Sequence, residues 1–152
     1  MGCWEKYHIE LFKDAKDYSD LVYITLDALE KMPQPIVQVC GPISSGGRGS
    51  IEKNLKIFKK TIRKLSEKHS VFDQTILEQP MRRIMKTYHC SHEENNRILL
   101  ESFYGPILKS GLIQKTFFID RWESSQGATW EHETSKKIGL ERFYLPENFL
   151  KR

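Results

Sequence analysis

The sequence predicts a single α/β domain in which a mostly parallel sheet of about four to five strands is flanked by helices, with an extra helix at the N-terminus. Short segments rich in β-branched and aromatic residues alternate with longer segments whose apolar residues follow helical spacing. Strands separated by helices pair in parallel through right-handed crossovers. The chain has 152 residues and is 39% hydrophobic, which is enough for one buried core.

The extra N-terminal helix is predicted over residues 17–32, where apolar residues recur at helical spacing until Pro33 and Pro35 end the pattern. The mixed composition of residues 4–13 gives no clear prediction. We therefore expect a helical extension over residues 1–34 and the α/β domain over residues 35–152.

The first strand of the domain is predicted at residues 36–40, which are short, apolar and rich in valine and isoleucine. A glycine-containing turn follows directly. Next comes the clearest helix of the chain, at residues 51–65, whose apolar residues form one continuous stripe after Ser50, a good N-cap. Further strands are expected at residues 70–73, 112–119 and 142–145, and further helices at residues 76–87, 91–108 and 127–138. This order is typical of a Rossmann-like or flavodoxin-like domain.

Composition limits the class of partner. The net charge is +4, a mild excess that suits an anionic small molecule. The lysines of the helix at residues 51–65 are interpreted as a solvated outer face, so nucleic acid is not expected as a partner; a nucleic-acid-binding patch is the alternative. Three scattered cysteines indicate a reducing compartment, so a cytoplasmic location is expected. No apolar run reaches the ~20 residues that span a bilayer, and no membrane partner is expected.

Two turns carry the candidate chemistry, and each follows a predicted strand. Ligands of open parallel sheets bind beyond the carboxyl ends of the strands, so both turns are expected at one site. The first turn, VCGPISSGGR at residues 39–48, offers hydroxyls, backbone N–H groups and a guanidinium to an anion. It matches neither the dinucleotide fingerprint nor the P-loop. Its candidate ligand-binding residues are Gly41, Ser44, Ser45, Gly46, Gly47 and Arg48.

The second turn is more specific because it precedes a helix start and adds an acid. Ser124, Ser125 and Gly127 place hydroxyls and free N–H groups at the beginning of the helix. Glu131 follows about one turn later, where the helix dipole is expected to favour its ionised form. An ionised glutamate in a cleft can attack an electrophilic carbon or stabilise an oxocarbenium ion. A purely structural capping glutamate is the alternative.

These two turns resemble those of the 2′-deoxynucleoside 5′-monophosphate N-glycosidases, which belong with the nucleoside 2-deoxyribosyltransferases. The resemblance covers residues 36–146 and rests on VCGPISSGGR at residues 39–48 and SQGATWE at residues 125–131. It implies that Glu131 is the nucleophile that attacks the anomeric carbon of deoxyribose. It also implies that Ser125 holds a 5′-phosphate, which favours a nucleotide over a nucleoside, and that the first turn contacts phosphate and sugar. Family relatives often dimerise, which implies a homodimer.

The sequence departs from the family pattern at two places. Gln38 stands in the first strand where the family often has a tyrosine, and the aspartate expected before the third strand is missing near Ile107. Loss of a general acid can cost roughly 10²–10⁴-fold in rate. Asp120, Glu123 or Glu101 are the candidate replacements.

The leading hypothesis is therefore hydrolysis or deoxyribosyl transfer at the N-glycosidic bond of a nucleoside 5′-monophosphate, without cofactor or metal. The alternative hypothesis is a nucleotide-binding sensor or interaction domain that has lost the chemistry. Trp122, Trp130 and Tyr144 are possible stacking or lining residues, with core packing as the other interpretation. His132, next to Glu131, is a weaker candidate for proton transfer because adjacent helical residues point apart.

Overall fold

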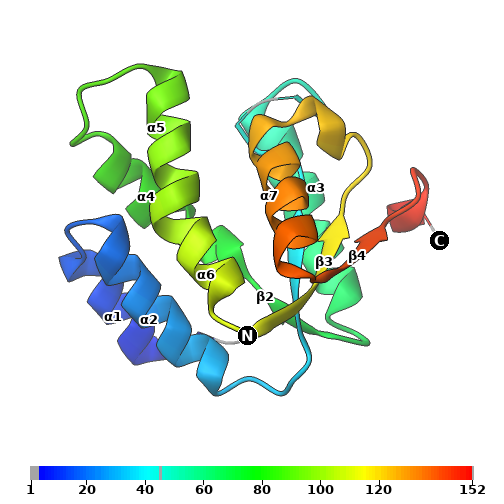
Figure 1. Cartoon of the computed structure of the whole chain (residues 1–152), viewed down its shortest axis with the longest axis horizontal. Coiled ribbons are helices and arrows are strands. Elements are labelled where there is room, and N and C mark those ends of the chain that lie inside the picture. The colour runs from blue at the N-terminus through cyan, green and yellow to red at the C-terminus, as the bar shows by residue number, and fades with distance from the viewer. Residues whose placement is uncertain (1–3, 45, 152) are drawn as a thin grey trace.

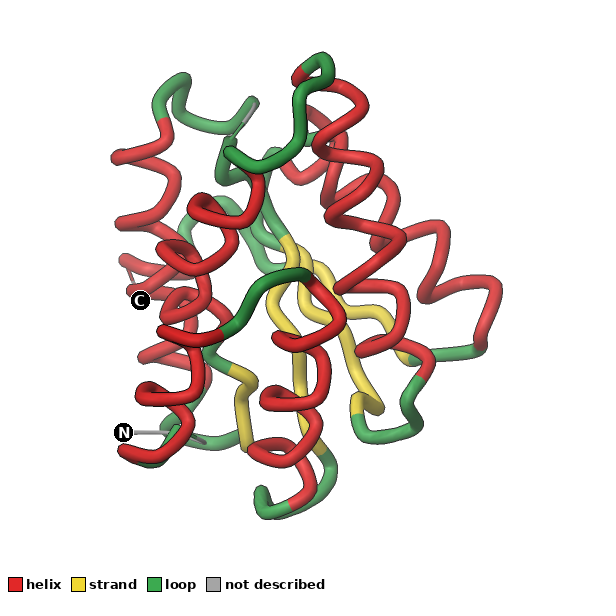
Figure 2. The backbone as a smooth tube through the Cα atoms, turned by 90° about the vertical axis from the view of Figure 1, so that its left-hand side faces the viewer, coloured by secondary structure: helices red, strands yellow, loops and turns green. Residues whose placement is uncertain are grey.

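A computed structural model describes residues 4–44 and 46–151 and shows a four-stranded, all-parallel sheet. The sheet order is β2-β1-β3-β4. Figure 2 shows the strands enclosed by helices on both sides, so the predicted α/β fold is confirmed. The strands are β1 (Ile36–Cys40), β2 (Ser70–Phe72), β3 (Ile113–Phe118) and β4 (Glu141–Tyr144).

The helices follow the predicted order, with one addition at the N-terminus (Figure 1). The addition is α1, which covers the segment that gave no clear prediction. The predicted helix at residues 91–108 is divided into α5 and α6 by a wider π-helical turn at Leu100–Tyr104. The helices are α1 (Lys6–Asp14), α2 (Tyr18–Glu30), α3 (Ile51–Leu65), α4 (Glu78–Met85), α5 (His92–Leu99), α6 (Gly105–Lys109) and α7 (Gln126–Ile138).

The two faces of the sheet bury different clusters, because successive side chains of a strand point to opposite faces. On one face, Val37 and Val39 of β1 pack in a cluster with Phe58 and Ile62 of α3. On the other face, Ile36 belongs to a cluster formed mainly by α1, α2, α4, α6 and the π-helical turn. Helix α7 lies on this second face, where it meets β1.

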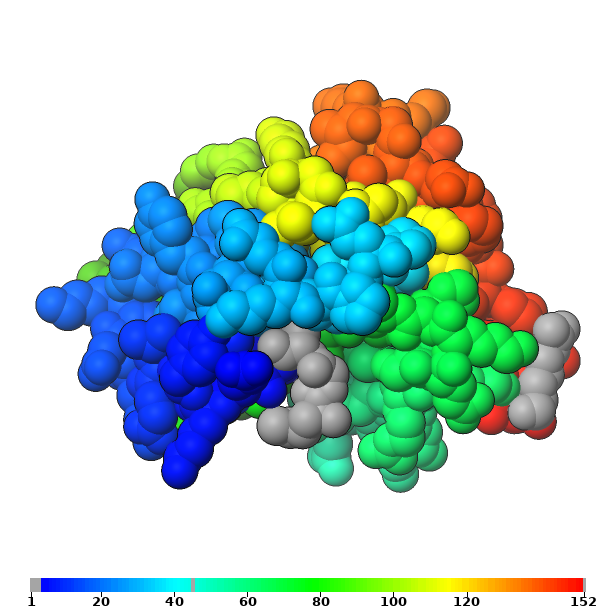
Figure 3. All heavy atoms as spheres, turned by 90° about the horizontal axis from the view of Figure 1, so that it is seen from below, coloured from blue at the N-terminus to red at the C-terminus, as the bar shows by residue number. Residues whose placement is uncertain are grey.

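The N-terminal helices belong to the second cluster and share its core. Leu21 and Ala28 of α2 are fully buried in the same cluster as Phe72 and Phe103. Seen from below, residues near the N-terminus (blue) lie at one end of the molecule and those near the C-terminus (red) at the other (Figure 3). Because α2 shares this cluster with later elements, the core extends across the predicted boundary between residues 34 and 35. The division into two regions stays a prediction. In the described parts of the chain, no helix has the length and apolar character needed to cross a membrane.

The sheet topology creates a crevice between β1 and β3. From β1 the chain crosses to β2 on one side, and it later returns to β3 on the other side of β1. At such a switch point the connections leave in opposite directions, so the carboxyl ends of the two strands open a site between them. The two candidate turns follow these two strands. The fold thus brings them to one edge of the sheet, as the sequence predicts.

Candidate functional site

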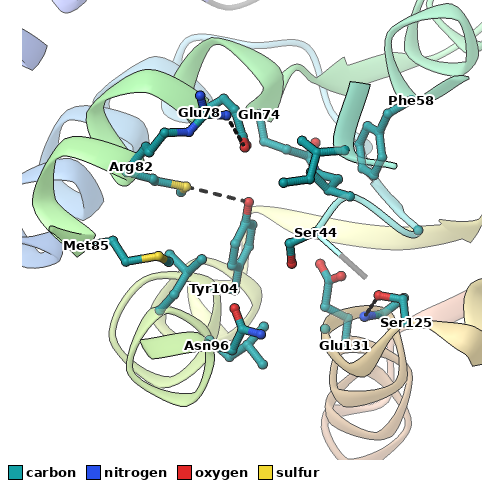
Figure 4. Close-up of a pocket in the computed structure, with 18 of the residues that line it drawn as sticks. Ser44, Phe58, Gln74, Glu78, Arg82, Met85, Asn96, Tyr104, Ser125 and Glu131 are labelled. Atoms are coloured by element: carbon teal, nitrogen blue, oxygen red, sulfur yellow. Dashed lines mark hydrogen bonds and ion pairs between the residues drawn. The ribbon is translucent and has the colours of Figure 1, made fainter. Parts of the chain in front are cut away.

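A cavity of about 210 Å³ lies at the carboxyl edge of the sheet. Helices α4 and α5 lie on one side of it and the start of α7 on the other (Figures 1 and 4). This volume is below the ~300–1,000 Å³ of drug-sized pockets, so the cavity suits a small ligand or one end of a larger one. Its wall is largely aliphatic and aromatic. Its polar lining residues include Ser44, Gln74, Glu78, Arg82, Ser125 and Glu131.

Glu131 is a buried acid in the wall of this cavity. Its side chain extends from α7, and the residue is only 7% exposed. Nε2 of Gln38 donates a hydrogen bond of 2.6 Å to Oε2 of Glu131, and the Cys40 thiol is hydrogen-bonded to the same carboxylate. Burial raises the pKa of Glu131 to about 7, although the hydrogen bonds from Cys40 and Gln38 act in the opposite direction.

This raised pKa corrects the expectation that the helix dipole would keep Glu131 ionised. Glu131 is the sixth residue of α7, beyond the first turn where the dipole acts most strongly. The desolvation of its carboxyl group is the larger effect. The group is therefore close to half ionised near neutral pH, which suits an acid, a base or a nucleophile.

Ser125 directly precedes α7 and lines the same cavity. Its Oγ accepts a hydrogen bond of 3.1 Å from the backbone N–H of Ala128, which makes it the N-cap of the helix. This bond uses the hydroxyl as an acceptor and leaves its own proton for a ligand. Gly127, also in the cavity wall, belongs to the first helical turn, whose N–H groups have no partner within the helix.

The first turn contributes Gly41 and Ser44 to the cavity. Gly41 allows a close approach, because a Cβ at this position would lie 2.8 Å from Cδ1 of Ile119. Ser44 points toward Glu131 in Figure 4. The predicted candidate Ser45 lies outside the described residues.

The rest of the first turn joins the second turn instead of lining the cavity. Gly46 has a φ of +69°, and a Cβ there would lie 2.3 Å from the Ser124 carbonyl oxygen. The N–H of Gly47 donates a hydrogen bond of 2.7 Å to Oγ of Ser124. Arg48 is outside the cavity, and its Nη2 lies 3.9 Å from Oδ2 of Asp120. Gly46, Gly47 and Ser124 therefore connect the two turns by close backbone contact and a hydrogen bond.

The opposite wall of the cavity contains two charged residues that were not predicted from the sequence. Glu78 and Arg82 face the cavity from α4 and form an ion pair of 3.5 Å. They lie four positions apart, so one turn of α4 brings the carboxylate and the guanidinium together. The cavity thus has an acid on each of its two sides.

Tyr104 is a third residue of the opposite wall that was not predicted. Its ring extends between α4 and Glu131, and its hydroxyl contacts the Met81 sulphur at 4.0 Å (Figure 4). It belongs to the π-helical turn, and such turns are frequent at functional sites. The sequence signal was Pro106, which lacks the N–H that a regular helix would use.

The three predicted replacements for the missing aspartate lie elsewhere. Glu101 is exposed and accepts a hydrogen bond of 2.9 Å from Arg97, and Glu123 is exposed. Neither these two acids nor Asp120 lines the cavity. The only carboxylate besides Glu131 in the described part of the cavity wall is Glu78.

The candidate aromatic residues of the second turn also lie outside the cavity. Trp122 stacks on His132 with ring centroids 4.3 Å apart, and Nε2 of His132 lies 2.7 Å from the Tyr144 hydroxyl. These residues form a separate cluster near the β4 edge. Trp130 packs against the core on the second sheet face. None of these side chains is therefore placed to stack on a ligand of Glu131.

Among the described residues, no group of three or more His, Cys, Asp and Glu side chains is arranged to hold a metal ion. Comparisons with protein-family models, with curated proteins and with solved structures find no match to this chain. The lining residues of the cavity supply the chemical groups that the structure shows. The cavity combines one buried acid of near-neutral pKa, hydroxyl and N–H donors on the same wall, and a second carboxylate on the opposite wall.

Proposed function

We propose that this protein hydrolyses, or transfers deoxyribose from, the N-glycosidic bond of a nucleoside 5′-monophosphate, with Glu131 as the nucleophile. The observation that carries this proposal is that buried Glu131 lines the same cavity as Ser125 and Gly127, which offer a hydroxyl and backbone N–H groups at the start of α7. Ser125 caps the helix and Glu131 is its sixth residue. This separation suits a substrate in which one sugar lies between the phosphate and the reactive carbon.

In the proposed reaction, ionised Glu131 attacks C1′ of the sugar while the bond to the base breaks. The burial of the carboxylate lowers the dielectric constant around it and strengthens its interaction with positive charge that develops on the sugar ring. The Ser125 hydroxyl and the N–H groups at the start of α7 donate to the phosphate. Hydrolysis by water, or attack by a second base, then releases the sugar from Glu131.

Glu78 is the proposed proton donor to the leaving base, in place of the missing family aspartate. It is on α4, across the cavity from Glu131, so a sugar bound against Glu131 presents its base toward Glu78 (Figure 4). Protonation of the base makes it a better leaving group. A cytoplasmic location, where free nucleotides are available, and a homodimeric assembly remain part of this proposal.

A nucleotide-binding protein without turnover is the second candidate function. It is favoured by the ion pair between Glu78 and Arg82, because the Glu78 carboxylate is engaged with a guanidinium and not with a leaving base. In this case the cavity would bind the nucleotide, and Glu131 would serve for recognition.

Incubation of the protein with a panel of deoxynucleoside monophosphates, with chromatographic measurement of free base, tests the proposal. We expect base release by the native chain and its loss in Glu131→Gln. Glu133→Gln is the matched control, since the side chain of Glu133 is on the same helix and 60% exposed. Calorimetric binding without release supports the second candidate. If Glu131→Gln releases free base as fast as the native chain does, Glu131 is not the nucleophile.

A further inference from the structure

A basic groove runs along the outer side of α3, away from the cavity. Its walls are α3 and the last two residues of the C-terminal turn at Phe149–Lys151, namely Leu150 and Lys151, and its volume is about 970 Å³. Lys64 joins the two walls, because its ammonium group donates a hydrogen bond to the Phe149 carbonyl and lies over the Phe149 ring. The groove is lined by seven cationic residues, Arg48, Lys53, Lys56, Lys60, Arg63, Lys64 and Lys151, and by one acid, Glu67.

The positive charge of the molecule is concentrated in this groove. Seven cations and one anion give it a formal charge of +6, whereas the whole chain carries +4, so the remainder of the chain is net negative at −2. Among the described residues, no carboxylate forms an ion pair with Lys53, Lys56, Lys60 or Arg63. Clustered like charges repel one another, and a bound polyanion would remove that repulsion.

We propose that this groove binds the phosphodiester backbone of nucleic acid without reading its bases. Along α3 the cations recur every three or four residues, and from Lys53 to Lys64 they extend over about 16 Å at 1.5 Å per residue. One strand of a duplex carries about five phosphates over that length. Among the described residues that line the groove none is aromatic, so base stacking contributes nothing and backbone charge carries the affinity.

The shape of the surface favours a strand over a membrane. The cations of α3 lie between that helix and Leu150 and Lys151 of the C-terminal turn, an elongated arrangement that a strand can follow. Its described lining includes only two aliphatic residues, Ile57 and Leu150, which is too few for insertion into lipid. This inference is independent of the proposed reaction at Glu131. The sequence predicts that Arg48 binds the phosphate of a small ligand. In this proposal Arg48 instead belongs to the groove that binds a polyanion.

Fluorescence anisotropy with labelled oligonucleotides of about 20 nucleotides, single-stranded and duplex, tests the groove. We expect binding whose logarithmic salt dependence has a slope between about −3 and −5, equal for different sequences. The triple variant Lys56→Gln/Lys60→Gln/Arg63→Gln is expected to weaken binding at least tenfold and to reduce the slope by about two to three.

The control variant Lys59→Gln/Lys136→Gln/Lys137→Gln removes the same charge from exposed positions outside the groove and should retain nearly native affinity. Equal weakening by both triple variants would show an effect of net charge alone and would overturn the proposal. If neither the single-stranded nor the duplex oligonucleotide binds at low salt, the proposal is also overturned. Binding to vesicles of anionic phospholipid in the absence of oligonucleotide binding would overturn it as well.

Discussion

Nε2 of Gln38 donates a hydrogen bond of 2.6 Å to Oε2 of Glu131, and this bond joins the central strand β1 to the buried acid on α7. It stabilises the ionised carboxylate, since an N–H group donates to a carboxylate better than to a neutral acid. Gln38 therefore lowers the pKa of Glu131 and opposes part of the effect of burial.

Replacement of this donor should raise the pKa of Glu131 further. In Gln38→Leu the burial of Glu131 remains while one of its two stabilising hydrogen bonds is lost, so the pKa moves above about 7. Side-chain carboxyl NMR during a pH titration measures the shift. An unchanged or lower pKa in the variant would show that the hydrogen bond does not stabilise the carboxylate.

Burial of Glu131 should make the protein less stable as pH rises from about 4.5 to about 7. The pKa is raised from 4.5 in the unfolded chain to about 7 in the folded protein. Between these values the folded state binds more protons, so the free energy of unfolding falls with rising pH. The difference between the two pKa values corresponds to about 3 kcal/mol.

Denaturant unfolding of Glu131→Gln at pH 5 and pH 8 measures this effect. The variant lacks the ionisation, so its stability should change less between the two pH values than that of the native chain. Glu133→Gln, on the exposed side of the same helix, should retain the native pH dependence. Parallel curves for the native chain and Glu131→Gln would contradict the raised pKa.

Gly46 should tolerate alanine far less well than Gly111. Both have positive φ angles, +69° and +85°, which cost a residue with a side chain about 1 kcal/mol or more. At Gly46 a Cβ would also lie 2.3 Å from the Ser124 carbonyl oxygen, whereas nothing lies within 4 Å at Gly111. We expect Gly46→Ala to lower the free energy of unfolding by about 3 kcal/mol or more.

Chemical denaturation of Gly46→Ala and Gly111→Ala provides the comparison. Because both variants carry a similar conformational cost, the difference between them reports the contact between the two turns. Equal losses of stability would show that this contact is dispensable.

Local signals made the fold and the near wall of the cavity predictable. The apolar stripe of α3, the N-cap of α7 at Ser125 and its C-cap at Gly139 all act within a few residues of their own position. The parallel topology follows from the alternation of strands and helices, and it brings both turns to one edge of the sheet. These features needed no knowledge of long-range contacts.

The far wall of the cavity was not predictable, because it depends on how distant elements pack. Glu78 reaches the cavity only because α4 lies across the carboxyl edge from α7, which is far away along the chain. Tyr104 faces Glu131 because the π-helical turn changes the direction of side chains before Pro106. The direction of Arg48 depends on the contact of its turn with Ser124, which no local pattern specifies.

Ser125 should have two separable roles, as an N-cap and as a phosphate donor. Its Oγ accepts from the Ala128 N–H, so Ser125→Ala is expected to lower the free energy of unfolding by about 1 kcal/mol. Ser91 caps α5 in the same way, by accepting from the Glu94 N–H, but it does not line the cavity. Ser91→Ala therefore carries the same capping cost without loss of a ligand contact.

Calorimetric titration of both variants with a deoxynucleoside and its 5′-monophosphate separates the two roles. We expect Ser125→Ala to weaken monophosphate binding at least about tenfold, since a hydrogen bond to a charged group contributes about 1.5–3 kcal/mol, and to change nucleoside binding little. Ser91→Ala should bind both ligands as the native chain does. If Ser125→Ala and Ser91→Ala behave alike toward the monophosphate, Ser125 is a cap and nothing more, and the phosphate must be held elsewhere.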